Sequence, residues 1–150
     1  MHDQPSHPDL SSPERFRSTR RAHMDETAED YVEAIAQLIE QRGEARIGAL
    51  AEMMGVSHVT VSKIIARLSS EGLVTTEPRR PVVLTHSGRE MARASIERHR
   101  VVLGFLLAIG VTESQAQIDA EGIEHHVSGE TLAALRTLME KLSNLPTQMD

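Results

Sequence analysis

The chain has 150 residues, about the length of one domain, and 39% of them are apolar although aromatic residues reach only 2%. Its 16 Lys and Arg face 22 Asp and Glu, so the net charge of −6 excludes binding of nucleic acid through overall basicity, and any DNA contact must come from a local patch. The absence of cysteine excludes disulfides, thiolate zinc sites and a cysteine nucleophile, which leaves nitrogen and oxygen donors for a metal site.

The apolar residues are spread along the chain rather than gathered into one long run. No stretch approaches the roughly 18 apolar residues that span a bilayer, and the first residues lack the apolar core of a signal peptide. The lack of cysteine also suits a reducing compartment. We therefore predict a cytoplasmic protein without a membrane partner.

The first residues predict a disordered arm. Residues 1–24 contain three prolines and few large apolar side chains. The end of this stretch is basic, because it contains Arg15, Arg17, Arg20 and Arg21. The cluster is compatible with contacts to phosphates and also with a solvated tail, which is the more frequent role of such a cluster.

Helical periodicity begins near Thr27. Tyr31, Ile35 and Leu38 recur on one helix face, and Gly43 supplies the stop. A second helix is predicted up to Gly55, and a third begins after an N-cap serine and ends at residues 71–72. The N-cap and the predicted buried face of the third helix are Ser57, Val61, Ile64, Ile65 and Leu68.

A hairpin follows these helices. Residues 73–76 and 82–85 are β-prone, and the charged segment 77–81 between them contains two prolines. Helix, tight turn, helix and hairpin is the order of a winged helix-turn-helix. Ala51 and Gly55 favour it over an unrelated helical hairpin, because a small residue fits where helices cross and glycine permits a positive φ.

The third helix predicts a DNA-reading surface. Val59 and Lys63 lie opposite its apolar side, at about 100° per residue. Such a face can present a methyl contact for thymine, hydroxyls for base edges and cations for guanine or phosphate. Any amphipathic helix leaves similar residues in water, so the helix-turn-helix context carries this prediction. The predicted DNA-binding residues are Ser57, Val59, Thr60, Ser62, Lys63, Arg67, Arg79 and Arg80.

The remainder of the chain predicts further helices. A long helix is expected over about 87–109, with its cap near residues 85–86 and Gly110 at its end. Two more are expected over about 113–126 and 129–142, and the chain after them is expected to be loose. Thr112 and Ser128 are their predicted N-caps. The fold class is therefore mainly α, with a small β-hairpin.

One segment concentrates metal-ligand residue types. Glu121, Glu124 and His125 are spaced i, i+3 and i+4, so on a helix their donor atoms can converge on one cation. Asp30 and Glu33 repeat the i, i+3 spacing near the start of the first helix. A solvated face explains the pair at 30 and 33 well, and for the triplet both explanations stand.

Signals for an enzyme are weak. The zinc-hydrolase pattern His-x-x-Glu-His would require histidine at position 121, where glutamate stands. The sequence also lacks a serine elbow and a phosphate-binding glycine loop. His99 lies in the middle of the long helix, where a lone histidine is more often a surface or core residue than a ligand.

Together these segments resemble the DtxR/MntR family of metal-responsive repressors over about residues 27–142. The most specific matches are residues 29–33, 55–68, 98–99 and 119–126. The resemblance implies a homodimer that binds a palindromic double-stranded DNA operator and takes no small organic substrate. It places the family's metal ligands on Asp30, Glu33, His99, Glu121, Glu124 and His125.

The likeness also discriminates within the family. Iron-type members place sulfur ligands where Asp30 and Glu121 stand, and they carry an SH3-like domain for which this chain has no room. Carboxylates and imidazoles suit Mn(II), with Fe(II) as second choice. The resemblance therefore implies a manganese-responsive repressor of manganese uptake genes. The long arm and Pro81 in the hairpin, where glycine is more usual, depart from the family pattern.

Two alternatives remain at this point. One is a metal-independent winged-helix regulator that uses its acidic helical part as a partner surface, and the remote one is a metal-dependent enzyme. The expected organisation is a basic arm (1–24), a winged helix-turn-helix domain (25–90), a helical metal-binding and dimerisation domain (91–143) and a flexible tail (144–150).

Overall fold

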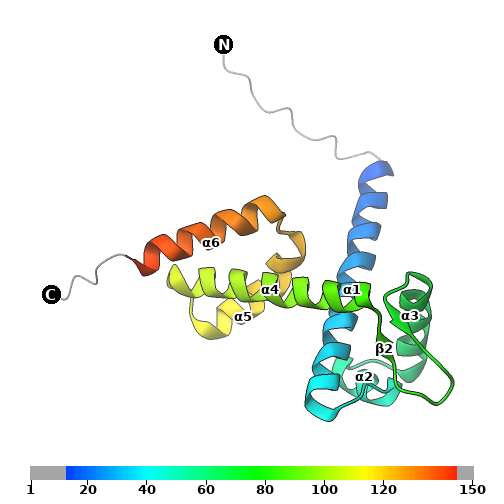
Figure 1. The fold of residues 1–150 in the computed structure, drawn as a ribbon. Coiled ribbons are helices and arrows are strands. Elements are labelled where there is room, and N and C mark those ends of the chain that lie inside the picture. Colours follow the sequence, from blue (N-terminus) through cyan, green and yellow to red (C-terminus); the bar gives the residue numbers. More distant parts are fainter. Residues whose placement is uncertain (1–12, 145–150) are drawn as a thin grey trace.

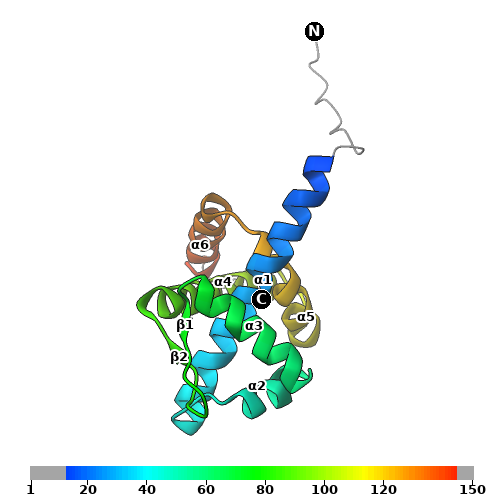
Figure 2. The ribbon, with the colours of Figure 1, turned by 90° about the vertical axis from the view of Figure 1, so that its right-hand side faces the viewer.

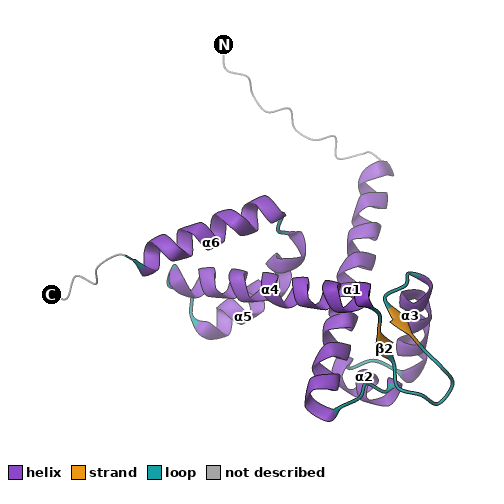
Figure 3. Cartoon of the chain, in the orientation of Figure 1, coloured by secondary structure: helices purple, strands orange, loops and turns teal. Residues whose placement is uncertain are grey.

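The computed structural model describes residues 13–144, apart from the side chains at positions 15 and 143. It is mainly helical, as the sequence predicts, with the winged helix at one end and the C-terminal helices at the other (Figures 1 and 3). No helix in this range is long and apolar enough to cross a membrane. The elements are α1 (Pro13–Arg42), α2 (Ile47–Met54), α3 (His58–Ser70), β1 (Val74–Thr75), β2 (Val83–Leu84), α4 (His86–Ala108), α5 (Glu113–Ile123), the 3-10 helix η1 (Glu124–His126) and α6 (Gly129–Ser143).

Helix α1 begins at Pro13, so the expectation of disorder was wrong for residues 13–24. Proline fits the first turn because its missing N–H has no helical partner there, and Glu14 in that turn complements the helix dipole. The arginines that follow are good helix formers. Residues 1–12 of the expected arm and residues 145–150 of the expected tail lie outside the described part of the chain.

The turn between α2 and α3 has the predicted geometry. Gly55 adopts a φ of 67°, which glycine reaches without a steric penalty, and its N–H bonds to the Ala51 carbonyl. Ser57 caps α3, because its hydroxyl accepts a hydrogen bond from the Thr60 N–H at 3.1 Å. The two helices are therefore joined as a helix-turn-helix.

The hairpin is shorter than the sequence predicts. Val74 pairs with Leu84 and Thr75 with Val83 in an antiparallel ladder of two residues per strand. Val82 does not extend this ladder, because its N–H bonds to the Ala45 carbonyl, at 2.7 Å, in front of α2. The hairpin is thus tied to the helix-turn-helix as well as to its own strands.

The hairpin also fixes the start of α4. The Thr85 hydroxyl caps this helix by accepting from the Gly88 N–H, and it donates to the Gly72 carbonyl. A Cβ at Gly88 would lie 2.0 Å from the Leu73 carbonyl oxygen, so only glycine fits this crossing. The direction in which α4 leaves the winged helix is therefore set by close backbone contact.

The described residues form two hydrophobic cores. The larger lies in the winged helix, between α1, α2, α3 and the hairpin, and includes Ile35, Leu38, Leu50 and Leu68. The smaller lies between α4, α5 and α6 and consists of Val102, Leu106, Ala116 and Ala120 with partly buried neighbours. Helix α4 connects the two halves and crosses α1 (Figure 1).

Helix α5 ends earlier than predicted. It stops at Ile123, and residues 124–126 tighten into the 3-10 helix η1 before Ser128 caps α6. Thr112 occupies the N-cap position of α5, but its side chain makes no capping hydrogen bond. Glu124 and His125 therefore lie on a tighter helix than the continuous α-helix expected from the spacing.

Candidate metal centre and nucleic-acid interface

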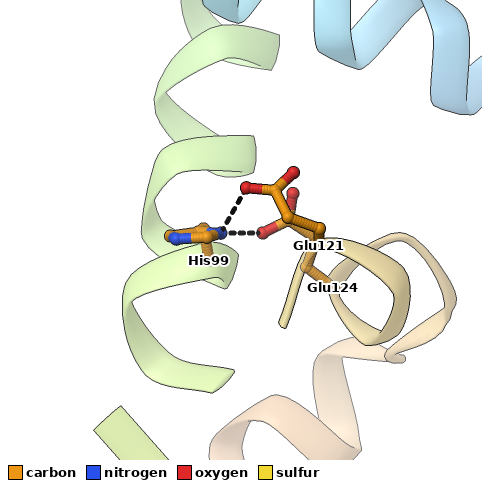
Figure 4. A group of neighbouring side chains, drawn as sticks. All are labelled: His99, Glu121 and Glu124. Carbon is orange, nitrogen blue, oxygen red and sulfur yellow. Dashed lines mark hydrogen bonds and ion pairs between the residues drawn. The ribbon is translucent and has the colours of Figure 1, made fainter. Parts of the chain in front are cut away.

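Acidic and imidazole side chains meet where α1, α4 and the end of α5 come together. Helix α4 supplies His99, the last turn of α5 supplies Glu121, and η1 supplies Glu124 (Figure 4). His99 Nδ1 lies 2.6 Å from Glu124 Oε2 and 3.8 Å from Glu121 Oε1. One potential ligand atom from each residue lies within 4.8 Å of the other two, which is a spacing that one cation can bridge.

Glu124 is the most deeply buried member of this group. Its side chain is 3% exposed, whereas that of Glu121 is 68% exposed. Burial raises the pKa of Glu124 above its ordinary 4.5, although the neighbouring His99 imidazole acts in the opposite direction. A buried carboxylate is costly unless a cation compensates its charge.

His125 extends the group towards α1. Its side chain is 4% exposed, and its Nε2 lies 3.2 Å from Asp30 Oδ1 and 3.5 Å from Glu124 Oε1. Its other nitrogen, Nδ1, lies 2.8 Å from Glu29 Oε2. Burial alone lowers the pKa of His125, but the hydrogen bond to Glu29 and the nearby carboxylates outweigh this effect and raise it above 6.5.

Asp30 faces the same space from α1. Burial raises its pKa above the ordinary 3.8, His125 opposes this shift, and the carboxylates of Glu26, Glu121 and Glu33 add to it. Contacts therefore run from Asp30 through His125 and Glu124 to His99 and Glu121. The structure thus brings together five of the six residues to which the resemblance assigned metal ligation.

Glu33 is the sixth, and its carboxylate has a different partner. Its Oε2 accepts a hydrogen bond of 2.9 Å from the hydroxyl of Ser95 on α4. Ser95 is only 1% exposed, so this bond joins α1 to α4 in the interior of the protein. The donors gathered near His99 do not include the Glu33 carboxylate in this arrangement.

Sequence reasoning missed Glu29 and Arg98. Arg98 on α4 forms an ion pair with Glu29 through an Nη2–Oε1 contact of 2.6 Å. The other Glu29 oxygen, Oε2, is hydrogen-bonded to His125 Nδ1. Glu29 thereby connects α1 with both α4 and η1. A signal was present, since Glu29 precedes Glu33 by one helical turn and shares its face.

The donor set fits a hard divalent cation. Within residues 13–144, the gathered atoms are carboxylate oxygens and imidazole nitrogens, which suit Mn(II) and Fe(II). Three carboxylates face two imidazoles, so neutral histidines would leave a negative pocket that contains the buried Glu124. The chemistry and the burial both favour a bound cation at this junction.

The exposed face of α3 carries most of the predicted DNA contacts. Val59 is 63% exposed on this face. Thr60, Ser62 and Lys63 are exposed beside it. The Ser57 hydroxyl lies 2.9 Å from that of Thr60 as part of the helix cap. This face combines one apolar group, several hydroxyls and one cation, a mixture that can read base edges in a major groove.

Arg67 lies apart from that face. Its Nη2 donates a 3.2 Å hydrogen bond to the Met24 carbonyl of α1, and its Nε lies 3.6 Å from Glu71 Oε1. The side chain is 25% exposed. It therefore fastens α3 to α1, and the structure does not bring it together with Lys63 on the outer face.

The hairpin tip presents Arg79 and Arg80 to solvent. Arg79 adopts a left-handed φ of 63°, which is uncommon for a residue with a side chain, and its carbonyl accepts a 3.3 Å bond from Arg46. A cavity of about 530 Å³ separates this tip from Ser62 and Ala66 of α3. The tip and the helix thus line one concave surface.

Comparison with known proteins gives two family matches. The family described as "Iron dependent repressor, N-terminal DNA binding domain" matches residues 23–82. The one described as "Iron dependent repressor, metal binding and dimerisation domain" matches residues 85–149. The two matches divide the chain between the winged helix and the C-terminal helices.

Individual relatives match most of the chain. "Transcriptional regulator MntR" of Escherichia coli O157:H7 is 48% identical over 128 residues, which are 85% of this chain and 83% of the relative. "HTH-type transcriptional regulator MntR" of Bacillus subtilis (strain 168) is 36% identical over 112 residues, 75% of this chain and 79% of the relative. The solved structure "Manganese-dependent transcriptional repressor complex with manganese" has a TM-score of 0.67 at 34% identity. That match covers 75% of this chain and 52% of the solved one, so this chain spans about half the length of that protein.

Proposed function

The chain belongs to the iron dependent repressor family, which is the DtxR/MntR family that its sequence resembles, and from this premise we propose that it is a manganese-activated transcriptional repressor. In this proposal a homodimer binds operator DNA through the two winged helices. The regulated genes would be those of manganese uptake. Because the partner is operator DNA, we also propose a cytoplasmic location and no enzymatic activity.

The observation that carries the proposal is the placement of the donor cluster. Asp30 belongs to the helix that packs against the helix-turn-helix, whereas His99, Glu124 and His125 belong to α4 and η1 of the other half. Contacts of 2.6 to 3.5 Å connect them. A site with ligands on both halves couples its occupancy to the position of the DNA-reading surface.

We assign metal ligation to Asp30, His99, Glu121, Glu124 and His125, with Glu33 as a further candidate. Glu33 would have to exchange the Ser95 hydroxyl for the cation. A divalent cation bound there would compensate the carboxylate charge and tie α1 to α4 and η1. The preference for manganese rests on the hard donors and on the manganese-dependent relative named above.

Glu29 and Arg98, which lie beside the proposed ligands, orient His125. With Glu29 accepting from Nδ1–H, the neutral His125 imidazole directs its Nε2 lone pair towards Asp30 and Glu124. Arg98 holds Glu29 in place and balances its charge. Glu29 and Arg98 are therefore positioning residues that select the tautomer a metal ligand requires.

A metal titration of the stripped protein tests the proposal. Operator duplexes would be selected from random sequence with manganese-loaded protein, and their binding would then be followed by fluorescence anisotropy as Mn(II), Fe(II) without oxygen, or Zn(II) is added. We expect binding that depends on metal and responds to Mn(II). Equal DNA affinity with and without metal would instead support a metal-independent regulator, and turnover without DNA affinity would support an enzyme.

A further inference from the structure

Helix α1 carries a row of arginines before it enters the core. Arg17, Arg20 and Arg21 are exposed, and their i, i+3 and i+4 spacing places them on one helix face. Among residues 13–24 the only acidic residue is Glu14. The segment is therefore locally basic within a chain whose net charge is −6.

This arginine row, formed by Arg17, Arg20 and Arg21, continues into the interface with the winged helix. Met24, Ala28 and Tyr31 follow Arg21 in steps of three, four and three residues, so they share its helix face. Ala28 and Tyr31 are each 3% exposed. The arginines thus lie on the side by which α1 packs into the larger core. This core also contains Val61, Ile65 and Leu68 of α3, so the arginines lie on the side of α1 that faces the winged helix.

The row is also held at a defined place beside α3. Arg67 of α3 donates to the Met24 carbonyl, just where the exposed part of α1 begins. From Met24 the helix extends about 10 Å to Arg17, at 1.5 Å per residue. A continuous helix anchored in this way presents its guanidinium groups at a set distance from the DNA-reading surface.

Figure 2 views the molecule from the side on which α3 lies in front of α1. The hairpin lies on one side of α3, and the projecting part of α1 lies on the other. In Figure 1 the projecting part of α1 likewise extends away from the hairpin, which overlaps α3 in that view. If α3 enters a major groove, the hairpin and the arginine row therefore approach the duplex on opposite flanks of that groove.

We propose that Arg17, Arg20 and Arg21 form a second DNA contact, which binds the phosphate backbone on the operator flank opposite the hairpin. This inference rests on the operator binding proposed above. Guanidinium groups are suited to phosphate, and such contacts add affinity without reading sequence. The basic segment thereby extends the DNA site beyond the winged helix.

The contact makes two quantitative predictions. Each phosphate neutralised contributes about 0.9 to the slope of log affinity against log salt, so loss of all three arginines lowers that slope by about 2 to 3 per protomer. The arginine row can contribute to the salt slope only if the duplex extends far enough to reach it. Trimming the flanks of the duplex should therefore remove this contribution from the wild type.

The test compares the wild type with the triple variant Arg17→Gln, Arg20→Gln and Arg21→Gln. Glutamine preserves helix propensity, and circular dichroism checks the fold. Both proteins, loaded with Mn(II), are titrated on a selected operator duplex with flanks about 10 base pairs longer than the selected core, one helical turn, and on the trimmed core. We expect a smaller salt slope for the variant on the long duplex and equal slopes on the core.

A charge-matched control separates a local contact from the overall charge. Arg93→Gln, Arg100→Gln and Lys141→Gln remove three exposed cations from α4 and α6. An unchanged slope in the arginine-row variant, or an equal drop in the control, would overturn the proposal. If manganese-loaded wild type bound no duplex at all, operator binding itself would fail, whereas failure of the arginine row alone leaves wild-type binding intact.

Discussion

The two halves of the molecule differ in the size of the hydrophobic core that each of them buries. The winged helix encloses Ile35, Leu38 and Leu50 entirely. The C-terminal half has a small core and leaves Ile118 66% and Ile109 54% exposed. A domain that leaves large apolar side chains in water is typical of one that is completed by a partner. Because this half matches a dimerisation domain, the partner is a second copy of the chain.

The candidate metal centre lies between these unequal halves. The proposed ligands on α4 and η1 belong to the half that we expect to be fixed by dimerisation, whereas the proposed ligand Asp30 belongs to α1, which packs into the core of the winged helix. Holding both readers at one separation favours two half-sites about one helical turn apart. The difference between the halves therefore explains why a metal site at their junction can control DNA binding.

The largest expected effect concerns the two cores. Leu50→Ala should lower the free energy of unfolding by about 2–5 kcal/mol, because Leu50 is fully buried in the larger core. Leu106→Ala should cost less, since Leu106 is 9% exposed and lies in the smaller core. Urea denaturation of metal-free protein measures both. Equal losses would contradict the contrast between the halves.

Glu124→Gln should weaken manganese binding by about 100-fold or more, since even partners behind the ligands account for 10–100-fold. Metal-free Glu124→Gln should nevertheless melt at a higher temperature, because it removes a carboxylate whose pKa is raised by burial. Calorimetry and thermal melts check the two effects. Glu90→Gln, on the exposed side of α4, is the control, and wild-type manganese affinity in Glu124→Gln would exclude ligation.

Ile118→Glu should weaken the dimer by about tenfold or more, because a charge is disfavoured in the core of an interface. Analytical ultracentrifugation measures the dissociation constant. Val83→Glu is the matched control, since Val83 is 53% exposed but lies in the hairpin. Equal weakening of the dimer by both substitutions would contradict the placement of α5 in the dimer interface.

Lys63→Gln should reduce operator affinity by about 1–3 kcal/mol if Lys63 reads a guanine, or reduce the salt slope by about one if it binds a phosphate. Arg67→Gln should leave the salt slope nearly unchanged, because its guanidinium is directed to Met24 and Glu71. Salt-dependent anisotropy titrations distinguish them. A salt slope reduced by about one for Arg67→Gln would show instead that Arg67 contacts a phosphate.

The smallest expected effect is a change of melting temperature with pH. The pKa values of Asp30, Glu124 and His125 are all raised, so the folded metal-free protein binds protons more tightly than the unfolded chain. Its stability should therefore fall as pH rises from about 5 to about 8. Protons compete with the metal for the same groups, so the rise in melting temperature caused by manganese should grow over that range. Thermal melts at fixed salt measure both effects, and a rise in melting temperature with manganese that is the same from about pH 5 to about pH 8 would contradict ligation by these groups.

Much of the architecture could be predicted because it depends on neighbours in the chain. The stop at Gly43, the turn at Gly55 and the caps at Ser57 and Ser128 each involve residues within one or two turns. Ligand types could also be recognised, because carboxylates and imidazoles at i, i+3 and i+4 form a local pattern. The start of α1 at Pro13 differs from the predicted disorder, because three prolines and few large apolar side chains favour disorder although proline also suits the first turn of a helix.

The remaining features depend on contacts that no local pattern contains. The sequence by itself predicted which residues have the chemistry to bind metal or DNA, since that is a property of side-chain type and helical spacing. Only the tertiary structure decided that Glu33 bonds Ser95, 62 residues away, that Glu29 holds His125, 96 residues away, and that Arg67 turns to α1. Each of these polar groups could have faced water, and the partner that it found was set by how α1 crosses α4 and packs beside α3.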